Sequence, residues 1–362
     1  MKIVSVVGAR PQFIKLSVVS REIRKRHKEI IIHTGQHYDL NMSDNFFREL
    51  DIPRPDINLG IGSMSHSSQI VAMMQSLERE LSRINPDLIM LYGDTNSTLA
   101  GALTASKMHI LAAHVEAGLR SFNMRMQEEI NRVATDHISS FLFCPSMNAV
   151  DNLRRENVMA GVFNVGDVML DSLNYFKGKL KRGVLDRYHL QRKRYHLATI
   201  HRAENTDNLR KLKVIIDAFT DSGERILFPV HPRTRKMINK GVRNLGANIK
   251  LIEPVGYLDM LSMEGSAKKI ITDSGGVQKE AYYLKVPCLT IREETEWIET
   301  VNCGANKLLP INKKIISRAI TEEWGGASFA KNLYGDGTAA KKILSIIDKR
   351  ADEIISRKKG CL

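Results

Sequence analysis

The sequence predicts two consecutive α/β domains, each built on a doubly wound parallel sheet covered by helices. Short apolar runs alternate with segments of helical periodicity along the chain, which is the pattern of repeated βα units. The same pattern starts again after Asp171, and 362 residues are enough for two domains that each bury a core. We therefore expect two such domains, joined near residues 165–190.

The expected strands are the apolar runs that end in turn-forming or polar residues. In the first half they are Ile3–Val7, Ile30–Thr34, Leu88–Tyr92, Ile110–Val115 and Phe141–Cys144, with helices at Phe13–His27, His66–Ile84, Thr98–Lys107 and Glu128–Ser139. In the second half the expected strands are Leu197–Ile200, Ile226–Val230, Ile249–Pro254, Lys269–Asp273 and Cys288–Ile291. Ligands of such sheets bind beyond the carboxyl ends of the strands, so we expect the chemistry in the loops that follow them.

The composition excludes several classes of protein. With 43% hydrophobic and 26% charged residues, the chain is typical of globular proteins rather than disordered or fibrous ones. The apolar run at the start is too short for a signal peptide or a membrane span. Four scattered cysteines without a CxxC pair indicate neither a disulfide framework nor a zinc ribbon. We expect a cytoplasmic protein with no metal and no membrane association.

The net charge of +14 has two interpretations. Basic surfaces attract polyanions, and Lys177–Arg194 is rich in Lys and Arg, so nucleic-acid binding is one of them. This run contains no known nucleic-acid signature, however, and a solvated helix face explains it more simply. We expect no nucleic-acid partner. A small anionic ligand such as a sugar nucleotide also benefits from the positive field.

The loop after the first strand argues against a nicotinamide cofactor. A dinucleotide fingerprint requires GxGxxG at this position, and residues 8–12 contain one glycine. The other candidate, Gly60–Gly62, follows no convincing strand and is interpreted as a loop. We therefore expect no cofactor. Arg10 is expected either to contact a diphosphate or to lie on the domain surface, and Lys15 follows one turn into the helix.

Carboxylates follow two neighbouring strands of the first half and open a later helix. Asp94 ends one strand beside hydroxyl residues, where acid/base catalysis and helix capping are both reasonable roles. Glu116 ends the next strand, and Glu128 opens a helix whose dipole alone favours acidic residues. Carboxylates at successive strand ends converge on one crevice, which indicates acid/base chemistry. A metal site formed by His114 and Glu116 is a further alternative.

In the second half, the strongest signal is the segment Thr272–Glu280. A strand is followed by a hydroxyl residue, two glycines and a helix, and the free N–H groups of such a helix favour a phosphate. Its Glu280 is placed to accept hydrogen bonds from a ribose, although a purely structural turn is the other interpretation. His201 and His231 follow two further strands at adjacent positions of the crevice.

Seven motifs, in order along the chain, resemble the non-hydrolysing UDP-N-acetylglucosamine 2-epimerase family. They are GARPQFIK, YGDTNST, HVEAGLRS, QEEINR, TIHRAEN, PVHP and TDSGGVQKEA, and the resemblance runs from residue 3 to about residue 345. It implies the GT-B architecture: two Rossmann-like domains face each other across a cleft, and the last helix crosses back to the first domain. The expected domains are residues 1–168 with 340–362, and residues 169–339.

The resemblance also implies roles for individual residues and a dimeric enzyme that acts on a UDP-sugar. The residues that match the family's catalytic positions are Asp94, Glu116, Glu128 and His201. The residues expected to bind the substrate are Arg10, Lys15, Arg202, His231, Ser274, Gly275, Gly276 and Glu280. The implied reaction supplies precursors for cell-surface polysaccharides or glycans, and the enzyme is expected to be a cytoplasmic homodimer.

Three departures from the family pattern are visible. Gln127 stands where the family usually has proline at the start of the helix that carries Glu128. Bacterial members have a second, regulatory substrate site, of which Gln36, His37 and Arg202 match a part, while residues 71–75 lack its arginine. Other motifs resemble the subgroup of UDP-2,3-diacetamido-2,3-dideoxyglucuronate 2-epimerases, which remains the alternative substrate.

Without NAD, inversion at C2 of a nucleotide sugar requires elimination of UDP, because no carbonyl acidifies that proton. A base removes the C2 proton, UDP leaves, a 2-acetamidoglucal forms, and UDP adds back as a proton arrives on the opposite face. This route needs acid/base groups on both faces of the ring and cations around the diphosphate. The alternatives are a GT-B glycosyltransferase, a hydrolysing epimerase that releases UDP, and a nucleic-acid-binding protein.

Overall fold

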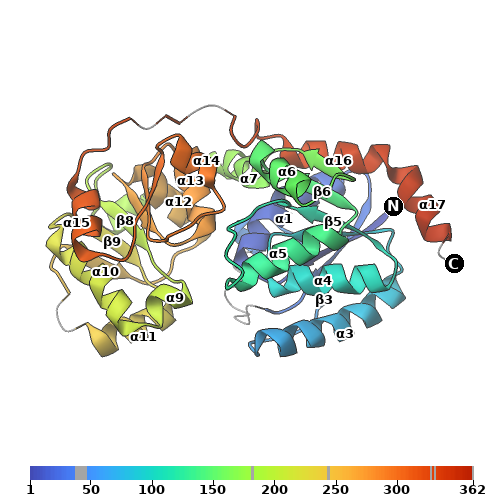
Figure 1. The fold of residues 1–362 in the computed structure, drawn as a ribbon, viewed down its shortest axis with the longest axis horizontal. Helices are drawn as coiled ribbons and strands as arrows, with labels where there is room; N and C mark the ends of the chain where they lie inside the picture. The colour runs from blue at the N-terminus through green and yellow to red at the C-terminus, as the bar shows by residue number, and fades with distance from the viewer. Residues whose placement is uncertain (37–46, 181–182, 243–244, 327, 330–331, 361–362) are drawn as a thin grey trace. The chain divides into compact units, whose positions relative to one another are not determined.

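The structure is a computed structural model that describes residues 1–36, 47–180, 183–242, 245–326, 328–329 and 332–360 (Figure 1). The chain forms two compact units. Unit 1 consists of Met1–Tyr175 and Asn332–Leu362, and unit 2 consists of Phe176–Lys331. Each unit contains a parallel sheet flanked by helices, which confirms the predicted α/β two-domain architecture.

The sheet of unit 1 has the order β3-β2-β1-β4-β5-β6-β7, and every pair of neighbouring strands is parallel. Its strands are β1 (Lys2–Val7), β2 (Lys28–His33), β3 (Ile57–Asn58), β4 (Leu88–Tyr92), β5 (Leu111–Val115), β6 (Phe141–Cys144) and β7 (Val162–Asn164). The strand order reverses direction between β1 and β4. The loops after these two strands therefore lie at the point where ligands of doubly wound sheets bind.

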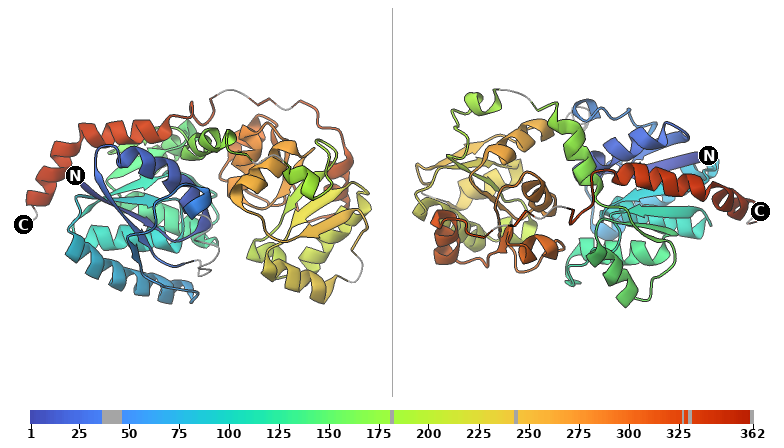
Figure 2. Two further views of the ribbon diagram at one scale, coloured as in Figure 1. Left: turned by 180° about the vertical axis from the view of Figure 1, so that it is seen from behind. Right: turned by 90° about the horizontal axis from the view of Figure 1, so that it is seen from above.

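Helices cover this sheet and bury its apolar side chains (Figure 2). They are α1 (Arg10–Ile23), α3 (His66–Ile84), α4 (Asn96–Lys107), α5 (Gln127–Ile138), α6 (Met147–Arg155), α7 (Val168–Lys177), α16 (Ala339–Lys349) and α17 (Ala351–Gly360). Helix α16 belongs to the end of the chain and packs against α1. Asp348 of α16 accepts a hydrogen bond from His27 at 2.8 Å, which fastens this segment to unit 1.

The sheet of unit 2 has the order β10-β9-β8-β11-β12-β13 and is also parallel. Its strands are β8 (His196–Thr199), β9 (Ile226–Pro229), β10 (Ile249–Ile252), β11 (Ile270–Thr272), β12 (Cys288–Thr290) and β13 (Asn306–Leu308). Here the order reverses between β8 and β11. The motifs that begin at Thr199 and Thr272 therefore follow the two strands at this switch point.

The helices of unit 2 are shorter and enclose their own apolar core. They are α8 (Val184–Arg187), α9 (Ala203–Thr206), α10 (Leu209–Asp221), α11 (Pro232–Gly241), α12 (Tyr257–Ser266), α13 (Gly275–Tyr283), α14 (Ile298–Asn302) and α15 (Lys313–Thr321). Among the residues that the structure describes, no helix is both long and apolar enough to cross a bilayer.

Three short strands, β3, β7 and β13, were not predicted. Each has only two or three residues, which is too short to show a periodicity. The loop Gly60–Gly62 consequently does follow a strand, since β3 ends two residues before it. The expectation of one solvated helix face at Lys177–Arg194 was wrong as well. Helix α7 ends where this run begins, and within the run only the short α8 is helical among the described residues.

Candidate active site

The loops at the switch point of unit 1 are joined by the buried side chain of Gln12. Its Oε1 accepts hydrogen bonds from the backbone N–H groups of Gly8 and Ala9 at 2.7 and 3.0 Å. Its Nε2 donates to the carbonyl of Tyr92 at 2.9 Å. Gly8 has no room for a side chain, since a Cβ there would lie 2.1 Å from Thr34 Oγ1. The loop that carries Arg10 is thus fixed to the loop that carries Asp94.

Lys15 and Glu116 form a nearly buried ion pair. The Nζ atom of Lys15 lies 2.7 Å from a carboxylate oxygen of Glu116, and each side chain is 8% exposed. Lys15 Nζ also passes Gly93, where a Cβ would lie only 2.8 Å from it. An ammonium so close favours the ionised form of the Glu116 carboxylate, and the low exposure leaves this attraction weakly screened.

Glu116 has an uncommon backbone conformation. Its φ of +76° places it in the left-handed region, which residues other than glycine, asparagine and aspartate seldom adopt. The N–H groups of Glu116 and Ala117 both donate to the carbonyl of Phe143 at 3.1 Å, which holds the turn. Backbone strain of this kind persists where the surroundings enforce it, and it is concentrated at functional sites.

Asp94 is not the cap of the following helix. The N-cap of α4 is Thr95, whose hydroxyl accepts from the N–H of Thr98. The carboxylate of Asp94 instead contacts the guanidinium of Arg132, and its backbone carbonyl accepts from Asn131 Nδ2 at 2.9 Å. Its side chain is 29% exposed. The carboxylate of Asp94 is therefore partly accessible. It is positioned by residues of α5 and does not cap α4.

The two adjacent glutamates of α5 differ strongly. Glu129 is buried, accepts from the N–H groups of Ser121 and Phe122, and contacts Arg132 at 2.9 Å. Glu128, the expected catalytic residue, is exposed in the first turn and makes no hydrogen bond or ion pair among the described residues. Gln127, in place of the usual proline, is the first residue of this helix. Glu129 is thus structural, whereas Glu128 is accessible to a ligand.

Arg10 is the first residue of α1 and is only partly exposed. Burial lowers the pKa of its guanidinium, while the charge of Glu49 acts in the opposite direction. A cation at a helix N-terminus opposes the helix dipole, which favours anions there. An anionic ligand at this end of α1 would offset the unfavourable interaction of the Arg10 charge with the helix dipole. This agrees with the interpretation that Arg10 contacts a diphosphate.

His114 is not available as a metal ligand. Its ring is fully buried, with Nδ1 2.7 Å from Asp136 Oδ1 and Nε2 2.6 Å from the carbonyl oxygen of Gly93. Both ring nitrogens are thus engaged, which excludes the metal site with Glu116. Among the described residues, no group of three or more His, Cys, Asp or Glu side chains is arranged to hold a metal ion.

In unit 2, a buried carboxylate organises the loop after β8. Asp273 follows β11, is fully buried, and accepts from the backbone N–H groups of His201 and Arg202 at 3.0 to 3.2 Å. It also accepts from Asn205 Nδ2 at 2.9 Å. The His201 ring is 51% exposed, with Nδ1 3.6 Å from Asp273, so the imidazole is accessible while its backbone is fixed.

The other two basic candidates of unit 2 have different surroundings. Arg202 is 18% exposed and lies 3.8 Å from the carboxylate of Glu296, which in turn pairs with the buried Arg292 at 2.8 Å. His231 is exposed and caps α11, since its Nδ1 accepts from the N–H of Arg233 at 3.3 Å. The structure thus gives His231 a capping role, and brings Arg202 into a charged cluster.

The turn of Ser274, Gly275 and Gly276 begins α13 without a side-chain cap. A Cβ at Gly276 would meet no atom within 4 Å, so packing within the described residues does not require glycine there. An anion that approaches the helix N-terminus would require it. Glu280, one turn further, is 5% exposed, and its charge adds to burial in raising the pKa of the neighbouring Glu264.

Sequence patterns did not reveal the residues that hold these loops. Gln12, Arg132 and Asp273 lie within the recognised motifs, but nothing in the sequence identifies their partners on other elements.

The residues that match part of the regulatory site are described only in part. Gln36 accepts from the hydroxyl of Ser97 at 2.7 Å, and His37 lies outside the described residues.

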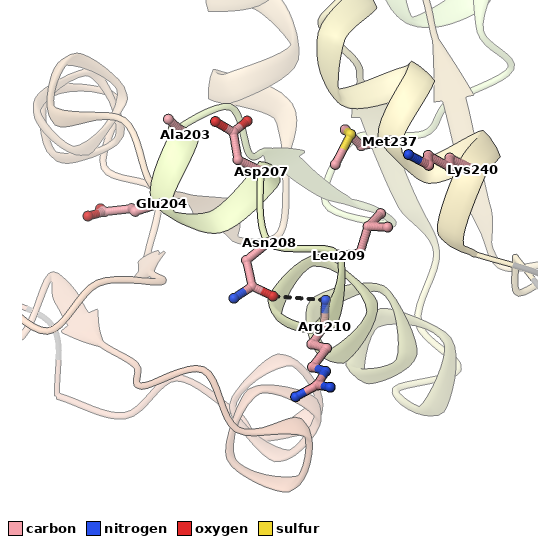
Figure 3. A pocket seen from close by; sticks show the side chains of 8 residues that line it. All are labelled: Ala203, Glu204, Asp207, Asn208, Leu209, Arg210, Met237 and Lys240. Carbon is pink, nitrogen blue, oxygen red and sulfur yellow. Dashed lines mark hydrogen bonds between the residues drawn. The ribbon is translucent and has the colours of Figure 1, made fainter.

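Figure 3 shows a surface pocket of unit 2. It is lined by Ala203, Glu204, Asp207, Asn208, Leu209, Arg210, Met237 and Lys240. None of these residues was predicted to act on a ligand. The hydrogen bond drawn in the figure joins Asn208 Oδ1 to the N–H of Arg210 at 3.0 Å and caps α10, which is a structural role.

Comparison with known proteins identifies close relatives along the whole chain. The model of the UDP-N-acetylglucosamine 2-epimerase family matches residues 21–348. A UDP-N-acetylglucosamine 2-epimerase homolog of Methanococcus maripaludis is 54% identical, over 96% of this chain and 99% of the relative. The UDP-2,3-diacetamido-2,3-dideoxy-D-glucuronate 2-epimerase of Pseudomonas aeruginosa is 44% identical, over 96% of this chain and 100% of the relative.

A solved structure is similar as well. The crystal structure of Methanocaldococcus jannaschii UDP-GlcNAc 2-epimerase in complex with UDP-GlcNAc and UDP has a TM-score of 0.89 at 43% identity. The match covers 96% of this chain and all of the other.

Proposed function

Because this chain belongs to the UDP-N-acetylglucosamine 2-epimerase family, we propose that it interconverts UDP-N-acetylglucosamine and UDP-N-acetylmannosamine. The resemblance inferred from the seven sequence motifs is thereby confirmed at the level of the family. The reaction inverts C2 and retains UDP in the product. It supplies a precursor for cell-surface polysaccharides or glycans.

The observation that carries this proposal is the Lys15–Glu116 pair beside Gly93. It combines a carboxylate on a strained backbone with a nearly buried cation, and Gly93 directly precedes Asp94. Acid/base catalysis at carbon needs carboxylates whose position and protonation are controlled in this way. Unit 1 therefore supplies most of the acid/base groups, which are Asp94, Glu116 and Glu128.

Unit 2 supplies the site for the diphosphate in this proposal. The open helix N-terminus at Ser274, Gly275 and Gly276 offers backbone N–H groups to an anion. Arg10 and Arg202 provide cations for the departing UDP, which carries additional negative charge once its bond to C1 breaks. His201 is accessible and its backbone is fixed, so it is the fourth candidate for proton transfer.

We infer that the reaction proceeds by elimination and re-addition of UDP. A carboxylate takes the C2 proton, the electron pair forms the C1–C2 double bond, and the C1–O bond to UDP breaks. The 2-acetamidoglucal stays bound. A proton then returns to C2 on the opposite face, and the diphosphate oxygen adds back at C1. The net oxidation state is unchanged, so no redox cofactor is needed.

The second candidate substrate is UDP-2,3-diacetamido-2,3-dideoxyglucuronate. The Pseudomonas relative that acts on this sugar is as similar to the chain, at 44% identity, as the Methanocaldococcus epimerase at 43%. The net charge of +14 also suits a substrate with an extra carboxylate. Because the diphosphate alone explains a basic protein, UDP-N-acetylglucosamine remains our first choice.

We also propose that the enzyme is a cytoplasmic homodimer. Three cysteines in the described part of the chain, Cys144, Cys288 and Cys303, are free thiols, as is usual in a reducing compartment. Size-exclusion chromatography with light scattering measures the mass of the assembly. A mass of twice 40.9 kDa supports the dimer, and a monomer mass contradicts it.

The deciding experiment offers each nucleotide sugar separately and follows the products by NMR. We expect UDP-N-acetylmannosamine from UDP-N-acetylglucosamine, with free UDP remaining far below the amount of product. Turnover of the diacetamido sugar alone would replace the first candidate by the second. Stoichiometric release of UDP would contradict the non-hydrolysing reaction.

A further inference from the structure

His114 is the fully buried centre of a charged cluster that the proposed reaction does not use directly. Its Nε2 lies 2.6 Å from the carbonyl oxygen of Gly93, which only accepts hydrogen bonds, so Nε2 carries a hydrogen. Its Nδ1 lies 2.7 Å from Asp136 Oδ1. Both ring nitrogens are therefore in contact with oxygen atoms of the protein.

The surroundings of Asp136 favour its ionised form. Its other oxygen, Oδ2, accepts from Arg120 Nη1 at 2.7 Å and from the N–H of Gly118 at 3.0 Å. Burial raises the pKa of Asp136, but the hydrogen bonds and charges of His114 and Arg120 outweigh it and lower the pKa below its ordinary value. Arg120 also pairs with Glu156 at 2.6 Å, so its guanidinium connects two carboxylates of the cluster.

This cluster connects the two loops that carry the candidate carboxylates. His114 is on β5, opposite Leu91 of β4, and its ring reaches the carbonyl of Gly93, directly before Asp94. The N–H of Gly93 donates back to the carbonyl of Val115 at 3.0 Å, directly before Glu116. A histidine ring and a backbone hydrogen bond therefore fix the separation of the Asp94 and Glu116 backbones.

The same cluster holds the turn after Glu116 in its strained form. Gly118 is anchored at both ends, because its N–H donates to Asp136 and its carbonyl accepts from Asn152 Nδ2 at 3.0 Å. A Cβ at Gly118 would lie 2.3 Å from the carbonyl oxygen of Ala149, so the turn has no freedom to shift outward. These contacts maintain the left-handed φ of Glu116.

We propose that His114 is a positioning residue: its buried ring, held between Asp136 and the Gly93 carbonyl, keeps Asp94 and Glu116 at the separation that proton transfer requires. The inference rests on the proposed epimerase function, since it assigns these carboxylates to the reaction. His114 itself does not exchange protons with the substrate, because both of its ring nitrogens are engaged by protein oxygen atoms. Its contribution is made through Gly93 and Asp136.

The test begins with the substitution His114→Phe, which keeps a flat ring and removes both hydrogen bonds. A misplacement of catalytic groups by about 1 Å costs on the order of a hundredfold in rate, so kcat should fall by about that factor. KM and the affinity for UDP should stay within about threefold, because the ring of His114 contacts Asp136 and Gly93 and none of the residues proposed to bind the diphosphate. Asp136→Asn is a milder change of the same cluster and should lower kcat by about tenfold. This variant replaces His114→Phe in the test if His114→Phe does not fold.

The matched control is His196→Phe in unit 2. His196 is also fully buried, but it makes no such close contacts: its Nδ1 has no hydrogen-bond partner among the described residues, and its Nε2 lies 3.5 Å from a carboxylate oxygen of Glu224. This variant should keep the wild-type kcat even if it loses stability. Equal losses of kcat in His114→Phe and His196→Phe would contradict the proposal, as would a kcat of His114→Phe within twofold of wild type.

Two measurements on the protein without turnover separate this inference from the proposed function. Nitrogen-15 NMR of the wild type should show a slowly exchanging hydrogen bonded to Nε2 of His114, and a ring without a hydrogen on Nε2 would overturn the proposal. Hydrogen exchange in His114→Phe should be at least about tenfold faster in peptides that cover residues 93–95 and 116–118. Unchanged exchange there would also overturn it. A wild type inactive on both sugars would refute the proposed function, while these two results still decide the role of His114.

Discussion

The switch-point loops of unit 1 and unit 2 are built on different principles. In unit 1 two of the three candidate carboxylates are paired with basic side chains, as in Lys15–Glu116 and Asp94–Arg132, and Glu116 has a strained backbone. In unit 2 the loops expose backbone N–H groups and the half-exposed ring of His201. The buried Asp273 fixes this loop by accepting hydrogen bonds from the backbone of His201 and Arg202. Buried pairs suit a reaction that needs controlled protonation, whereas open N–H groups suit the docking of an anion.

The two buried histidines show the same contrast. His114 of unit 1 has both ring nitrogens engaged and connects two loops. His196 of unit 2 lies in the core, where burial lowers its pKa to about 4 and the charge of Glu224 only partly offsets this. One buried imidazole thus connects the two loops that carry candidate carboxylates, while the other is part of the packing of unit 2.

The largest expected effect comes from removing the charge of Glu116. Glu116→Gln keeps the shape of the side chain, but it eliminates an acid/base group and leaves Lys15 without its partner at 2.7 Å. We expect kcat to fall by about a hundredfold or more, as is usual for loss of such a group. Asp94→Asn should behave similarly, and steady-state assays by NMR measure both.

The control for these variants is Glu29→Gln. Glu29 is a buried carboxylate of unit 1 that bonds to Ser5 and Arg24, away from the switch-point loops. It should cost stability and leave kcat unchanged. Near-normal kcat in both Glu116→Gln and Asp94→Asn would show that the paired carboxylates of unit 1 are structural only.

An intermediate effect is expected from Gly276→Val in unit 2. A Cβ at this position meets no atom within 4 Å, so the melting temperature should change little, but the branched group occupies the approach of the diphosphate. The dissociation constant for UDP should rise by at least about tenfold, or about 1.4 kcal/mol. Gly178→Val is the matched control, because Gly178 is also open and should leave UDP binding as in wild type. Wild-type affinity of Gly276→Val in calorimetry would move the nucleotide site elsewhere.

The smallest effect on turnover is expected from His196→Phe. This variant should instead change how the free energy of unfolding depends on pH. The pKa of about 4 in the folded protein lies below the ordinary value of 6.5, so the unfolded chain binds the proton more readily. This contribution to stability is complete above about pH 6.5 and is lost as the pH falls towards 4. Urea titrations between these values should show a shallower decline for the variant. An identical decline in both proteins would mean that His196 does not titrate in this way.

Much of the architecture and the location of the polar loops could be predicted from the sequence. Apolar runs followed by glycine and charged residues mark strand ends, and parallel topology brings such ends together at a switch point. Asp94, Glu116, His201 and Ser274 are therefore found in the expected loops. That they act in turnover stays a prediction, tested by the variants above.

What could not be predicted depends on contacts between distant residues. The pairing of Lys15 with Glu116 and of Asp94 with Arg132 links elements far apart in the chain, and no local pattern encodes it. The positive φ of Glu116 is equally invisible, because glutamate has no preference for that conformation. The strands β3 and β7 escaped notice for a different reason: they have two and three residues.

The central claim concerns the proton at C2. A protein group removes this proton as UDP leaves, and a new proton is added to C2 before UDP adds back at C1. The most direct measurement is turnover of UDP-N-acetylglucosamine in D2O, with the product and the recovered substrate analysed by NMR and mass spectrometry. We expect one deuterium at C2 of UDP-N-acetylmannosamine, because the group that protonates C2 exchanges its hydrogen with the solvent. A product that keeps its original hydrogen at C2 would indicate an internal hydride transfer and contradict the elimination mechanism.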